Sequence, residues 1–299
     1  MDRLQTMAVF IAVAEETGFA AAARRLNMSP PSVTRAVGEL EARLGARLLH
    51  RTTRAVRMTD AGERYLADCR RIVLEIEEAD SQAAGIHATP RGTVSLTGSA
   101  LFGRIVLTPI LVDLLDRYPD ISIDTLFVDR VVHLFDEGID IAVRIADLPD
   151  SSLAAIRVGG VRPLLCASPD YLVAAGYPQM PSDLAEHETI DFVNIMPHGE
   201  WALVRDGKGH SFKTRSRLRA NSADVAIAAA VAGRGITRVL SYMIAPQLEN
   251  GELEIVLPDF TPPAVPVHVV HKEQGQTSGR VRAVVDHLAD RLRQAPVLR

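Results

Sequence analysis

Arginine is the residue type whose placement most clearly indicates chemistry in this 299-residue chain. Residues 1–59 contain nine arginines, no lysine and five acidic residues, a formal charge of +4, whereas the whole chain carries −4. Residues 42–59 contain five of these arginines and no acidic residue. Arginine gathered in one small part of an acidic protein indicates a polyanion site, most economically for nucleic acid. A solvated surface is the alternative, and charge alone leaves the two about even.

Motifs that could support catalysis or hold a metal are incomplete. Gly98-Ser99 lacks the following glycine of a nucleophile elbow. Gly233-Arg234-Gly235 lacks the third glycine and the preceding strand of a phosphate-binding loop. His268 and His271 are three apart in an expected strand, so they point to opposite faces and make a poor metal pair. We therefore expect no enzymatic activity, no cofactor and no metal site.

Compartment is indicated by the cysteines and by the apolar runs. Cys69 and Cys166 have no disulfide-scaffold spacing, which fits a reducing compartment. No run reaches the ~18 apolar residues that span a bilayer, so no membrane association is expected. The run from Met7 to Ala14 could imitate a signal-peptide core, but only Arg3 precedes it and its spacing also fits a helix face. We interpret the chain as cytoplasmic, with secretion as the alternative.

Two short helices are expected to begin the chain. The first starts with a capping-box-like pair, Asp2 and Gln5, and ends before Thr17-Gly18. The second runs from Phe19 to Leu26, after which Asn27 can take the left-handed conformation that ends a helix. The apolar face predicted for the first helix consists of Leu4, Met7, Ile11 and Ala14.

A third helix is expected to carry the DNA-reading surface. Ser29 is a good N-cap, Pro30 suits the first turn, and the helix runs to about Leu44 with Gly45 as its stop. Two helices joined by a tight turn, the second exposing hydroxyls and an arginine near its start, match the helix-turn-helix, whose recognition helix enters the major groove. A generic three-helix core is the alternative. The expected apolar side is Val33, Val37, Leu40 and Leu44, which leaves Pro31, Ser32, Thr34, Arg35 and Gly38 on the flank and outer face.

A hairpin and a long helix are expected next. Residues 48–59 have room for a β-hairpin wing with three arginines, and a helix then runs from its cap at Thr59 to Pro90. A helix of about 28 residues spans roughly 42 Å, too long to cover one small domain. Its heptad spacing predicts a dimerisation seam, with packing along the protein's own body as the alternative. The seam consists of Tyr65, Cys69, Ile72, Ile76, Ala79 and Ala83.

Beyond Gly92 short apolar runs alternate with helical patterns. This alternation predicts a largely parallel sheet with helices on both faces. A second set of elements follows from about Leu164 to Pro263. The expected strands are Thr93–Thr97, Ile121–Phe127, Asp140–Ile145 and Val265–His271, and the expected helices are Arg104–Arg117, Arg130–Glu137 and Ser278–Arg293.

Together these residues resemble the LysR-type transcriptional regulators, and the resemblance covers the whole chain. Its most specific part runs from Phe19 to Gly62. The family usually places Gly-Ser-Phe before its second helix, whereas this chain has Thr17-Gly18-Phe19 and lacks that serine cap. The matching positions are Phe19, Ala22-Ala23-Arg24-Arg25-Leu26, Ser29-Pro30, Val33, Arg35, Leu40-Glu41, Leu44-Gly45, Leu48-Leu49, Arg51-Thr52-Thr53-Arg54, Thr59 and Ala61-Gly62.

The resemblance implies an α/β protein with an N-terminal all-α winged helix-turn-helix and a long linker helix. It also implies two periplasmic-binding-protein-like α/β subdomains with a small-molecule cleft between them. The residues implied to face DNA are Ser29, Pro31, Ser32, Thr34 and Arg35, with Arg51, Thr52 and Arg54 in the wing. The implied domains are 1–59 for DNA binding, 60–89 for the linker and dimerisation, and 92–299 for effector binding, with lobe 1 at 92–163 and 267–299 and lobe 2 at 164–266.

Ligands of open α/β sheets lie beyond the carboxyl ends of strands and at helix N-termini. Residues 97–102 follow the first strand, Ala167-Ser168 ends a crossover strand, and Asn221-Ser222 precedes an alanine-rich helix. Arg144 and Arg238 near the cleft would favour a carboxylate effector, although either could be exposed or structurally paired. The candidate effector-binding residues are Thr97, Ser99, Ala100, Leu101, Phe102, Arg144, Ser168, Asn221 and Arg238.

We interpret the chain as a dimeric or tetrameric transcription factor whose promoter binding or activity a small molecule modulates. The expected partners are double-stranded promoter DNA, the effector and further copies of the chain, with RNA polymerase as another candidate. The alternative is a small-molecule-binding protein whose N-terminal helices serve only assembly. Replacement of Arg35 or Arg51 by alanine separates the two, because only the first interpretation predicts a loss of promoter binding.

Overall fold

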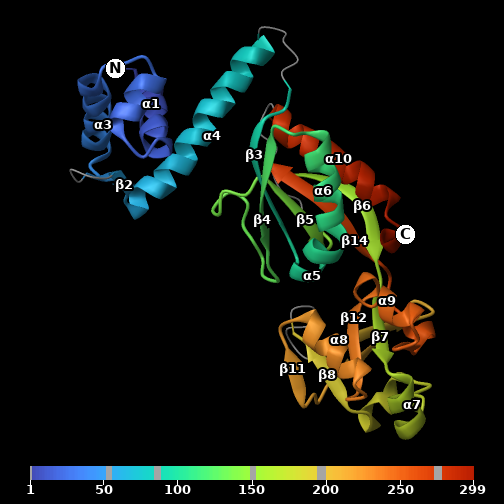
Figure 1. Cartoon of the computed structure of the whole chain (residues 1–299). Coiled ribbons are helices and arrows are strands. Elements are labelled where there is room, and N and C mark those ends of the chain that lie inside the picture. The colour runs from blue at the N-terminus through green and yellow to red at the C-terminus, as the bar shows by residue number, and fades with distance from the viewer. Residues whose placement is uncertain (1, 52–55, 84–88, 149–152, 194–199, 273–277) are drawn as a thin grey trace. The chain divides into compact units, whose positions relative to one another are not determined.

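The computed structural model describes residues 2–51, 56–83, 89–148, 153–193, 200–272 and 278–299. The chain divides into two compact units, Met1–Thr89 (unit 1) and Pro90–Arg299 (unit 2), and each is described by itself (Figure 1). No helix of the described residues is long and apolar enough to cross a membrane.

Unit 1 is built from four helices and a small hairpin. Apolar side chains of all four helices form one core, which includes Phe10, Val37, Leu40 and Cys69. The elements are α1 (Arg3–Glu15), α2 (Phe19–Arg25), α3 (Pro30–Leu44), β1 (Leu49–Arg51), β2 (Val56–Met58) and α4 (Asp60–Ala83).

Helix ends in unit 1 follow their local signals. Asn27 has φ +51° after α2, and Gly45 has φ +65° after α3, so both take the left-handed conformation expected of them. The Ser29 hydroxyl accepts a hydrogen bond from the Ser32 amide at 3.3 Å, which confirms the predicted N-cap of α3. Gly18 begins α2 with no side-chain cap, as the missing serine predicts.

Two predictions about these helices are wrong. Asp2 makes no side-chain capping bond to α1, so the capping box is absent. The buried residues of α1 include Val9, Phe10 and Val13, whereas Leu4, Ile11 and Ala14 are only half-buried. The run from Met7 to Ala14 is apolar all round the helix, so periodicity could not choose the buried face. In α3, Leu44 is exposed instead of buried.

Two polar side chains and one glycine fix the start of α4 against the hairpin. The Glu41 carboxylate accepts hydrogen bonds from the amides of Leu48 at 2.8 Å and Leu49 at 3.1 Å. The Thr59 hydroxyl accepts from the Gly62 amide at 2.9 Å, which confirms Thr59 as the cap of α4. A Cβ at Gly62 would overlap the carbonyl of Leu48, so only glycine allows this close approach.

Unit 2 contains two five-stranded sheets, which define lobe 1 and lobe 2. Lobe 1 contains β3 (Gly92–Gly98), α5 (Ala100–Phe102), η1 (Gly103–Leu107), α6 (Thr108–Arg117), β4 (Ile121–Phe127), β5 (Ile141–Ile145), β6 (Leu153–Val161), β14 (Val265–Lys272), α10 (Gly279–Gln294) and η5 (Pro296–Leu298). Lobe 2 contains β7 (Pro163–Ala167), α7 (Pro169–Ala175), η2 (Pro181–Glu186), β8 (Thr189–Phe192), β9 (Glu200–Arg205), β10 (Lys208–Lys213), β11 (Leu218–Ala220), α8 (Ala223–Val231), β12 (Ile236–Leu240), η3 (Ser241–Met243), α9 (Ala245–Glu249), β13 (Glu254–Val256) and η4 (Pro258–Phe260).

Each of the two sheets combines parallel and antiparallel strands. The orders are β4-β3-β5-β14-β6 in lobe 1 and β11-β8-β12-β7-β13 in lobe 2. β3 is parallel to β4 and β5, and β8 is parallel to β11 and β12. β7, which enters lobe 2 directly after β6, is antiparallel to β12. The expected mainly parallel arrangement therefore holds for three neighbouring strands of each lobe, β4, β3 and β5 in lobe 1 and β11, β8 and β12 in lobe 2. It does not hold for β14 and β6 in lobe 1 or for β7 and β13 in lobe 2.

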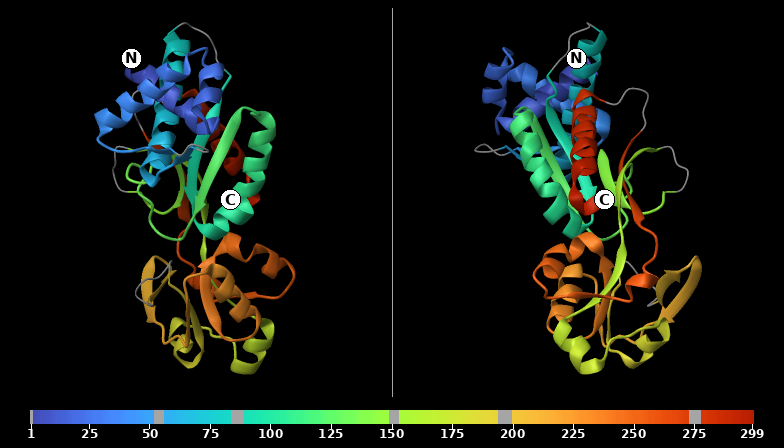
Figure 2. Two further views of the ribbon diagram at one scale, coloured as in Figure 1. Left: turned by 60° about the vertical axis from the view of Figure 1, so that its left-hand side comes forward. Right: turned by 90° about the vertical axis from the view of Figure 1, so that its right-hand side faces the viewer.

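The helices of lobe 1 cover one face of its sheet. α6 and α10 contact each other and pack on that face (Figures 1 and 2). Residues 128–140 cover the opposite face, where Val132 and Leu134 pack on Ala142 and Val270. The predicted helix Arg130–Glu137 is therefore wrong.

From Val131 to Phe135 the side chains alternate between solvent and the core, and the chain then turns, with the Glu137 amide donating to the carbonyl of His133 at 3.0 Å. Val132 and Leu134 are buried, whereas Val131 and Phe135 are 73% and 52% exposed. The segment is closed by an ion pair between Arg130 and Glu137 at 2.5 Å. The apolar spacing of residues 130–137 fits a helix, but packing of Val132 and Leu134 on the sheet stabilises a non-helical conformation instead.

Candidate DNA-binding and effector sites

The first turns of α3 present one exposed polar face. Pro31, Thr34 and Arg35 are exposed and Ser32 is half-buried, while Val33 and Val37 on the other side are fully buried. The hydroxyls of this face are held locally: Thr34 donates to the carbonyl of Pro30 at 3.0 Å, and Ser29 and Ser32 share a hydrogen bond of 2.8 Å. Arg35 has no ion-pair or hydrogen-bond partner in the described part of the chain, so its guanidinium is available to a ligand.

The predicted wing is present as the antiparallel hairpin of β1 and β2, in which Arg51 pairs with Val56. Thr52 and Arg54 lie outside the described residues, so their predicted contacts stay predictions. His50 and Arg57 are exposed and opposite each other in the hairpin. Arg57 is one of the three arginines of the predicted wing, although it was not among the residues implied to contact DNA.

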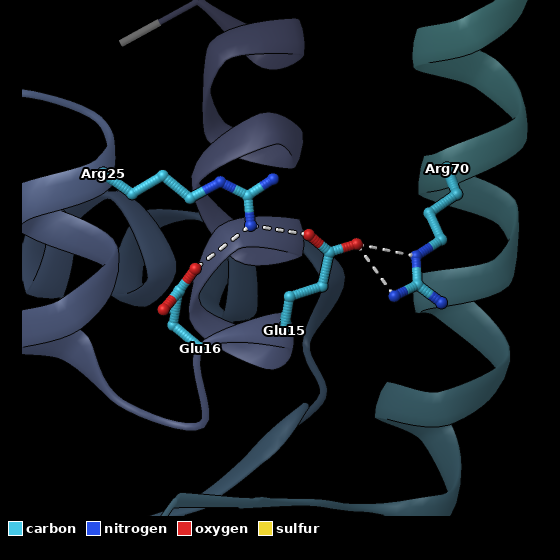
Figure 3. Close-up of polar contacts among 4 residues, drawn as sticks. All are labelled: Glu15, Glu16, Arg25 and Arg70. Atoms are coloured by element: carbon cyan, nitrogen blue, oxygen red, sulfur yellow. Dashed lines mark hydrogen bonds and ion pairs between the residues drawn. The ribbon is translucent and has the colours of Figure 1, made fainter.

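An ion cluster on another side of unit 1 involves two further arginines. The Glu15 carboxylate accepts from Arg25 at 2.7 Å and from Arg70 at 2.9 Å, and Arg25 also reaches Glu16 at 3.4 Å. Figure 3 shows Glu15 between the two guanidinium groups, which come from α2 and α4. Burial alone would raise the pKa of Glu15, but the hydrogen bonds from both arginines lower it below its usual value. The cluster connects three helices and neutralises Arg25, which therefore contributes less to an anion site than its position suggests.

The first part of the predicted dimerisation seam belongs to the core of unit 1. Cys69 is fully buried, and Tyr65 and Ile72 pack against the same core cluster. The rings of Tyr65 and Phe10 lie 6.0 Å apart. The predicted dimerisation role of Cys69 is therefore wrong, because a partner chain cannot reach it. The side chains of Ala79 and Ala83 lie outside the described residues, so their role stays a prediction, as does that of Ile76.

Both cysteine thiols are buried and have low reactivity. Burial raises the pKa of the Cys69 thiol to about 11 and that of Cys166 to about 12. The thiolate is the reactive form, so neither side chain is an activated nucleophile near neutral pH. The described residues contain no group of three or more His, Cys, Asp or Glu side chains arranged to hold a metal ion.

The loop after β3 contains the polar groups of the candidate effector site. The amide of Ala100, at the start of the helical run 100–117, donates to the Asp129 carboxylate at 3.0 Å. The Ser99 hydroxyl is buried and makes no full hydrogen bond to the described residues. Asp129 was missed in the sequence, because no local pattern connects residues 100 and 129.

Lobe 2 brings one further group to this loop. The ring of Tyr242, which follows β12, packs edge-on against Phe102 with ring centroids 5.1 Å apart. The Tyr242 hydroxyl is also buried without a full hydrogen bond. Burial raises the pKa of Tyr242 well above its usual range, and the nearby Ser99 hydroxyl lowers it slightly. Two hydroxyls from different lobes are thus buried close together and only weakly satisfied.

The remaining predicted effector residues divide between the two ends of the sheets. Thr97 donates to the carbonyl of Leu126 at 2.6 Å, and Arg144 donates to that of Val132 at 2.9 Å, so both stabilise lobe 1. Asn221 is exposed beside the start of α8, at the end of lobe 2 that contacts lobe 1. Arg238 lies within β12 opposite Leu165, and burial lowers its pKa.

Ser168 does not lie where the sequence predicts it. It is buried and accepts a hydrogen bond from the Tyr171 amide at 3.4 Å, as the N-cap of α7. Because β7 runs away from lobe 1, its carboxyl end lies at the far end of lobe 2, where Figure 1 shows α7. The carboxyl-end rule applies to the parallel strands β8, β11 and β12, and β7 is antiparallel. The predicted contact of Ser168 with a ligand between the lobes is therefore wrong.

A groove of about 1030 Å³ also lies between the lobes. Its lining includes Leu101, Ile105 and Ile110 from lobe 1 and Ile227 and Tyr242 from lobe 2. An exposed ion pair at 2.5 Å, between Arg104 and Asp224, joins the lobes in this lining. Of the predicted effector-binding residues, Leu101 alone lines the described part of this groove.

Comparison with known proteins agrees with this architecture. Residues 4–63 match the family model described as "Bacterial regulatory helix-turn-helix protein, lysR family", and residues 87–293 match "LysR substrate binding domain". The activator AaeR of Escherichia coli K12 is 32% identical over 291 residues, which cover 97% of this chain and 94% of AaeR. A transcriptional repressor of Pseudomonas aeruginosa is also 32% identical, over 99% of this chain and 94% of its own length.

Solved structures support the fold. CrgA of Neisseria meningitidis, a LysR-type transcriptional regulator, is 29% identical with a TM-score of 0.63, over 96% of this chain and 98% of CrgA. AphB of Vibrio cholerae is 24% identical with a TM-score of 0.62, over 97% and 99% of the two chains, and shows the fold alone. Because family models match both units and relatives match along nearly the whole length, the chain belongs to the LysR family of helix-turn-helix transcriptional regulators.

Proposed function

We propose that this regulator binds promoter DNA through the first turns of α3, with Arg35 as its main base- or phosphate-contacting group. The observation that supports this is the exposed polar face of α3, on which Arg35 has no partner in the described part of the chain while the local hydroxyls are already bonded. Arginine in the major groove can form paired hydrogen bonds to guanine. The Arg51 to Arg57 hairpin would add phosphate contacts beside the groove.

Footprinting on DNA upstream of its own and neighbouring genes, followed by affinity measurement, tests this proposal. Arg35→Ala should remove the footprint at protein concentrations that protect the site in the unsubstituted protein at moderate salt, while the protein stays folded and assembled. Arg71→Ala is the matched control, because Arg71 is an exposed arginine of α4 that pairs with Asp68 and is not part of α3. Binding of the unsubstituted protein should weaken steeply with salt, because phosphate contacts release counterions. Unchanged binding by Arg35→Ala would favour a protein whose N-terminal helices serve only assembly.

We propose further that two or four copies of the chain act together and that the distal part of α4 joins them. Two recognition helices reading two half-sites explain why so small a module suffices. Sedimentation velocity on Ile76→Glu tests the role of α4, since a charge in a helix seam disfavours pairing. The substitution should lower the oligomeric state while unit 1 keeps its unfolding temperature. An unchanged sedimentation coefficient would assign assembly to another surface.

We propose that the effector is a small carboxylate that takes the place of Asp129 at the amide of Ala100. The support is that this helix start already holds a carboxylate, and that the Ser99 and Tyr242 hydroxyls beside it are short of partners. Helix N-termini favour anions. The effector would change regulation only if it binds one arrangement of the lobes more tightly than another.

Calorimetry with a panel of small carboxylates and their amides tests this effector class. Asp129→Asn should bind the carboxylates more tightly than the unsubstituted protein, because the internal competitor is gone. Asp124→Asn, an exposed aspartate of β4, is the control and should bind as the unsubstituted protein does. Amides that bind as well as the carboxylates would contradict the proposal.

A further inference from the structure

We infer that lobe 2 carries a second, sequence-independent site for the DNA backbone, formed by Lys213, Arg215, Arg217 and Arg219. We call these four residues the basic ladder. All four are exposed. Their proposed ligand is the phosphate row of duplex DNA that flanks the sequence read by α3.

Hydrogen bonds of the intervening side chains orient the basic ladder toward solvent. Thr214 donates to the Asp191 carboxylate at 2.9 Å, and the Ser216 and Thr189 hydroxyls share a hydrogen bond of 2.8 Å. Both contacts anchor the segment to β8. Because alternate residues of extended chain point in opposite directions, these inward anchors leave residues 213, 215 and 217 pointing to solvent.

The described residues do not compensate the charge of the ladder. Residues 205–219 contain six Lys or Arg and one acidic residue, a formal +5 on a chain of −4. The four ladder side chains form no ion pair with other described residues, in contrast to Arg25, Arg104 and Arg130. An uncompensated row of cations attracts a polyanion and raises its local concentration.

The spacing of the ladder fits a strand of phosphates. Alternate residues of extended chain are about 6.6 Å apart, and the chain bends at residue 217, so the four cations extend over at most roughly 20 Å. One DNA strand carries a phosphate for about every 3.4 Å of helix axis, so the ladder can follow up to about six phosphates. Arginine and lysine are the usual phosphate-contacting side chains.

Two alternative roles account for less of this surface. Charges on an edge strand prevent pairing with other chains, and β11 is an edge strand. However, Arg215 and Arg217 lie outside β10 and β11, so edge protection does not require them. An acidic protein partner would also be attracted, but residues 213–219 contain neither Trp nor Tyr, which together with arginine provide most of the binding free energy in protein interfaces.

Binding of the full-length protein to two DNA lengths tests the inference. One duplex carries only the footprinted sequence, and the other extends it by about 30 base pairs on each side, enough for phosphates beyond the recognition site. The variant K213Q/R215Q/R217Q/R219Q should lose roughly 10-fold or more affinity for the long duplex at about 0.1 M salt and keep its affinity for the short one. On the long duplex, the slope of the logarithm of the binding constant against the logarithm of the salt concentration should fall in magnitude by roughly 3 to 4. Each phosphate that the variant no longer neutralises accounts for about 0.9 of this change.

Two control variants separate the ladder from net charge and from misfolding. R117Q/R282Q/R293Q/R299Q removes the same charge from exposed positions of lobe 1 and should bind both duplexes as the unsubstituted protein does. R215K/R217K/R219K keeps the charge and should restore binding to the long duplex. Arg35→Ala should weaken binding to both duplexes, so failure of the α3 site is distinguishable from failure of the ladder.

Three results would overturn the inference. Equal losses in the two glutamine variants would show an effect of net charge. Unchanged affinity of the ladder variant for the long duplex would show that these residues do not contact DNA. Unchanged DNA binding combined with loss of promoter-dependent transcription by RNA polymerase would assign the ladder to a protein partner.

Discussion

The two candidate sites of this protein differ in how completely their buried or partly buried polar groups are hydrogen-bonded. In unit 1, Glu15, Glu41 and Thr59 all bond to neighbouring helices or strands, and they fix the framework behind the exposed face of α3. In unit 2, Ser99 and Tyr242 are buried between the lobes without full hydrogen bonds. A satisfied framework behind an exposed face suits a preformed surface that binds DNA as it is. Buried groups that lack full hydrogen bonds suit a site that a ligand completes.

Arg25→Ala and Arg35→Ala give the sharpest test of the unit 1 half of this contrast. Arg35→Ala should weaken promoter binding roughly 10- to 100-fold, since a good arginine contact to a base contributes about 1–3 kcal/mol. Arg25→Ala should change affinity much less, because Arg25 is already paired with Glu15. Fluorescence anisotropy with labelled promoter DNA measures both. Equal losses would show that the ion cluster and the α3 face act as one surface.

Gly62→Ala tests whether the framework is closely fitted. The added methyl group would overlap the carbonyl of Leu48, so we expect a loss of about 1–3 kcal/mol in the free energy of unfolding of unit 1. Gly38→Ala is the matched control, because nothing lies within 4 Å of a Cβ there, and it should stabilise α3 by about 0.5–1 kcal/mol. Urea unfolding followed by circular dichroism measures both. Equal stabilities for the two variants would refute the close fit at Gly62.

Tyr242→Phe tests the unit 2 half of the contrast. It removes a buried hydroxyl that lacks a full hydrogen bond, so the free energy of unfolding of unit 2 should stay the same or rise by about 1 kcal/mol. Effector affinity should fall, because the ligand loses a partner. Tyr177→Phe, at an exposed tyrosine, should change neither quantity. A clear loss of stability in Tyr242→Phe would mean that the hydroxyl is satisfied in the free protein, and the contrast between the units would fail.

The smallest expected effect is the pH dependence of the Glu15 cluster. The pKa of Glu15 is lowered in the folded protein from 4.5, so its contribution to stability is present above about pH 4.5 and is lost as the pH falls through the folded pKa. Glu15→Gln should lower the unfolding temperature near neutral pH, and the difference from the unsubstituted protein should narrow in acid. Glu16→Gln should show a smaller difference, since Glu16 reaches Arg25 only at 3.4 Å. If the difference in unfolding temperature did not change with pH, the charge of the Glu15 carboxylate would not be its cause.

The two sites also differ in how much of each could be predicted. The cap, the stop and most of the buried side of α3 were predicted from neighbours within a few positions, with Leu44 as the exception. At the lobe junction, Asp129 and Tyr242 were missed, since they reach Ala100 and Phe102 from elements distant in the sequence. Ser168 was assigned to the junction because the direction of β7 within its sheet cannot be read from the strand alone.

Short-range signals along the chain were enough to predict the helix-turn-helix, the limits of α2 and α3, most strands of lobe 1 and the family of the protein. These features depend on caps, turn residues and periodicity, which act over a few residues. Folding in three dimensions was needed to establish which arginines of unit 1 are neutralised, that Cys69 is buried, that residues 130–137 are not helical and that Ser168 lies far from lobe 1. Each of these depends on contacts between distant segments, whose free energies exceed the local preferences of the chain.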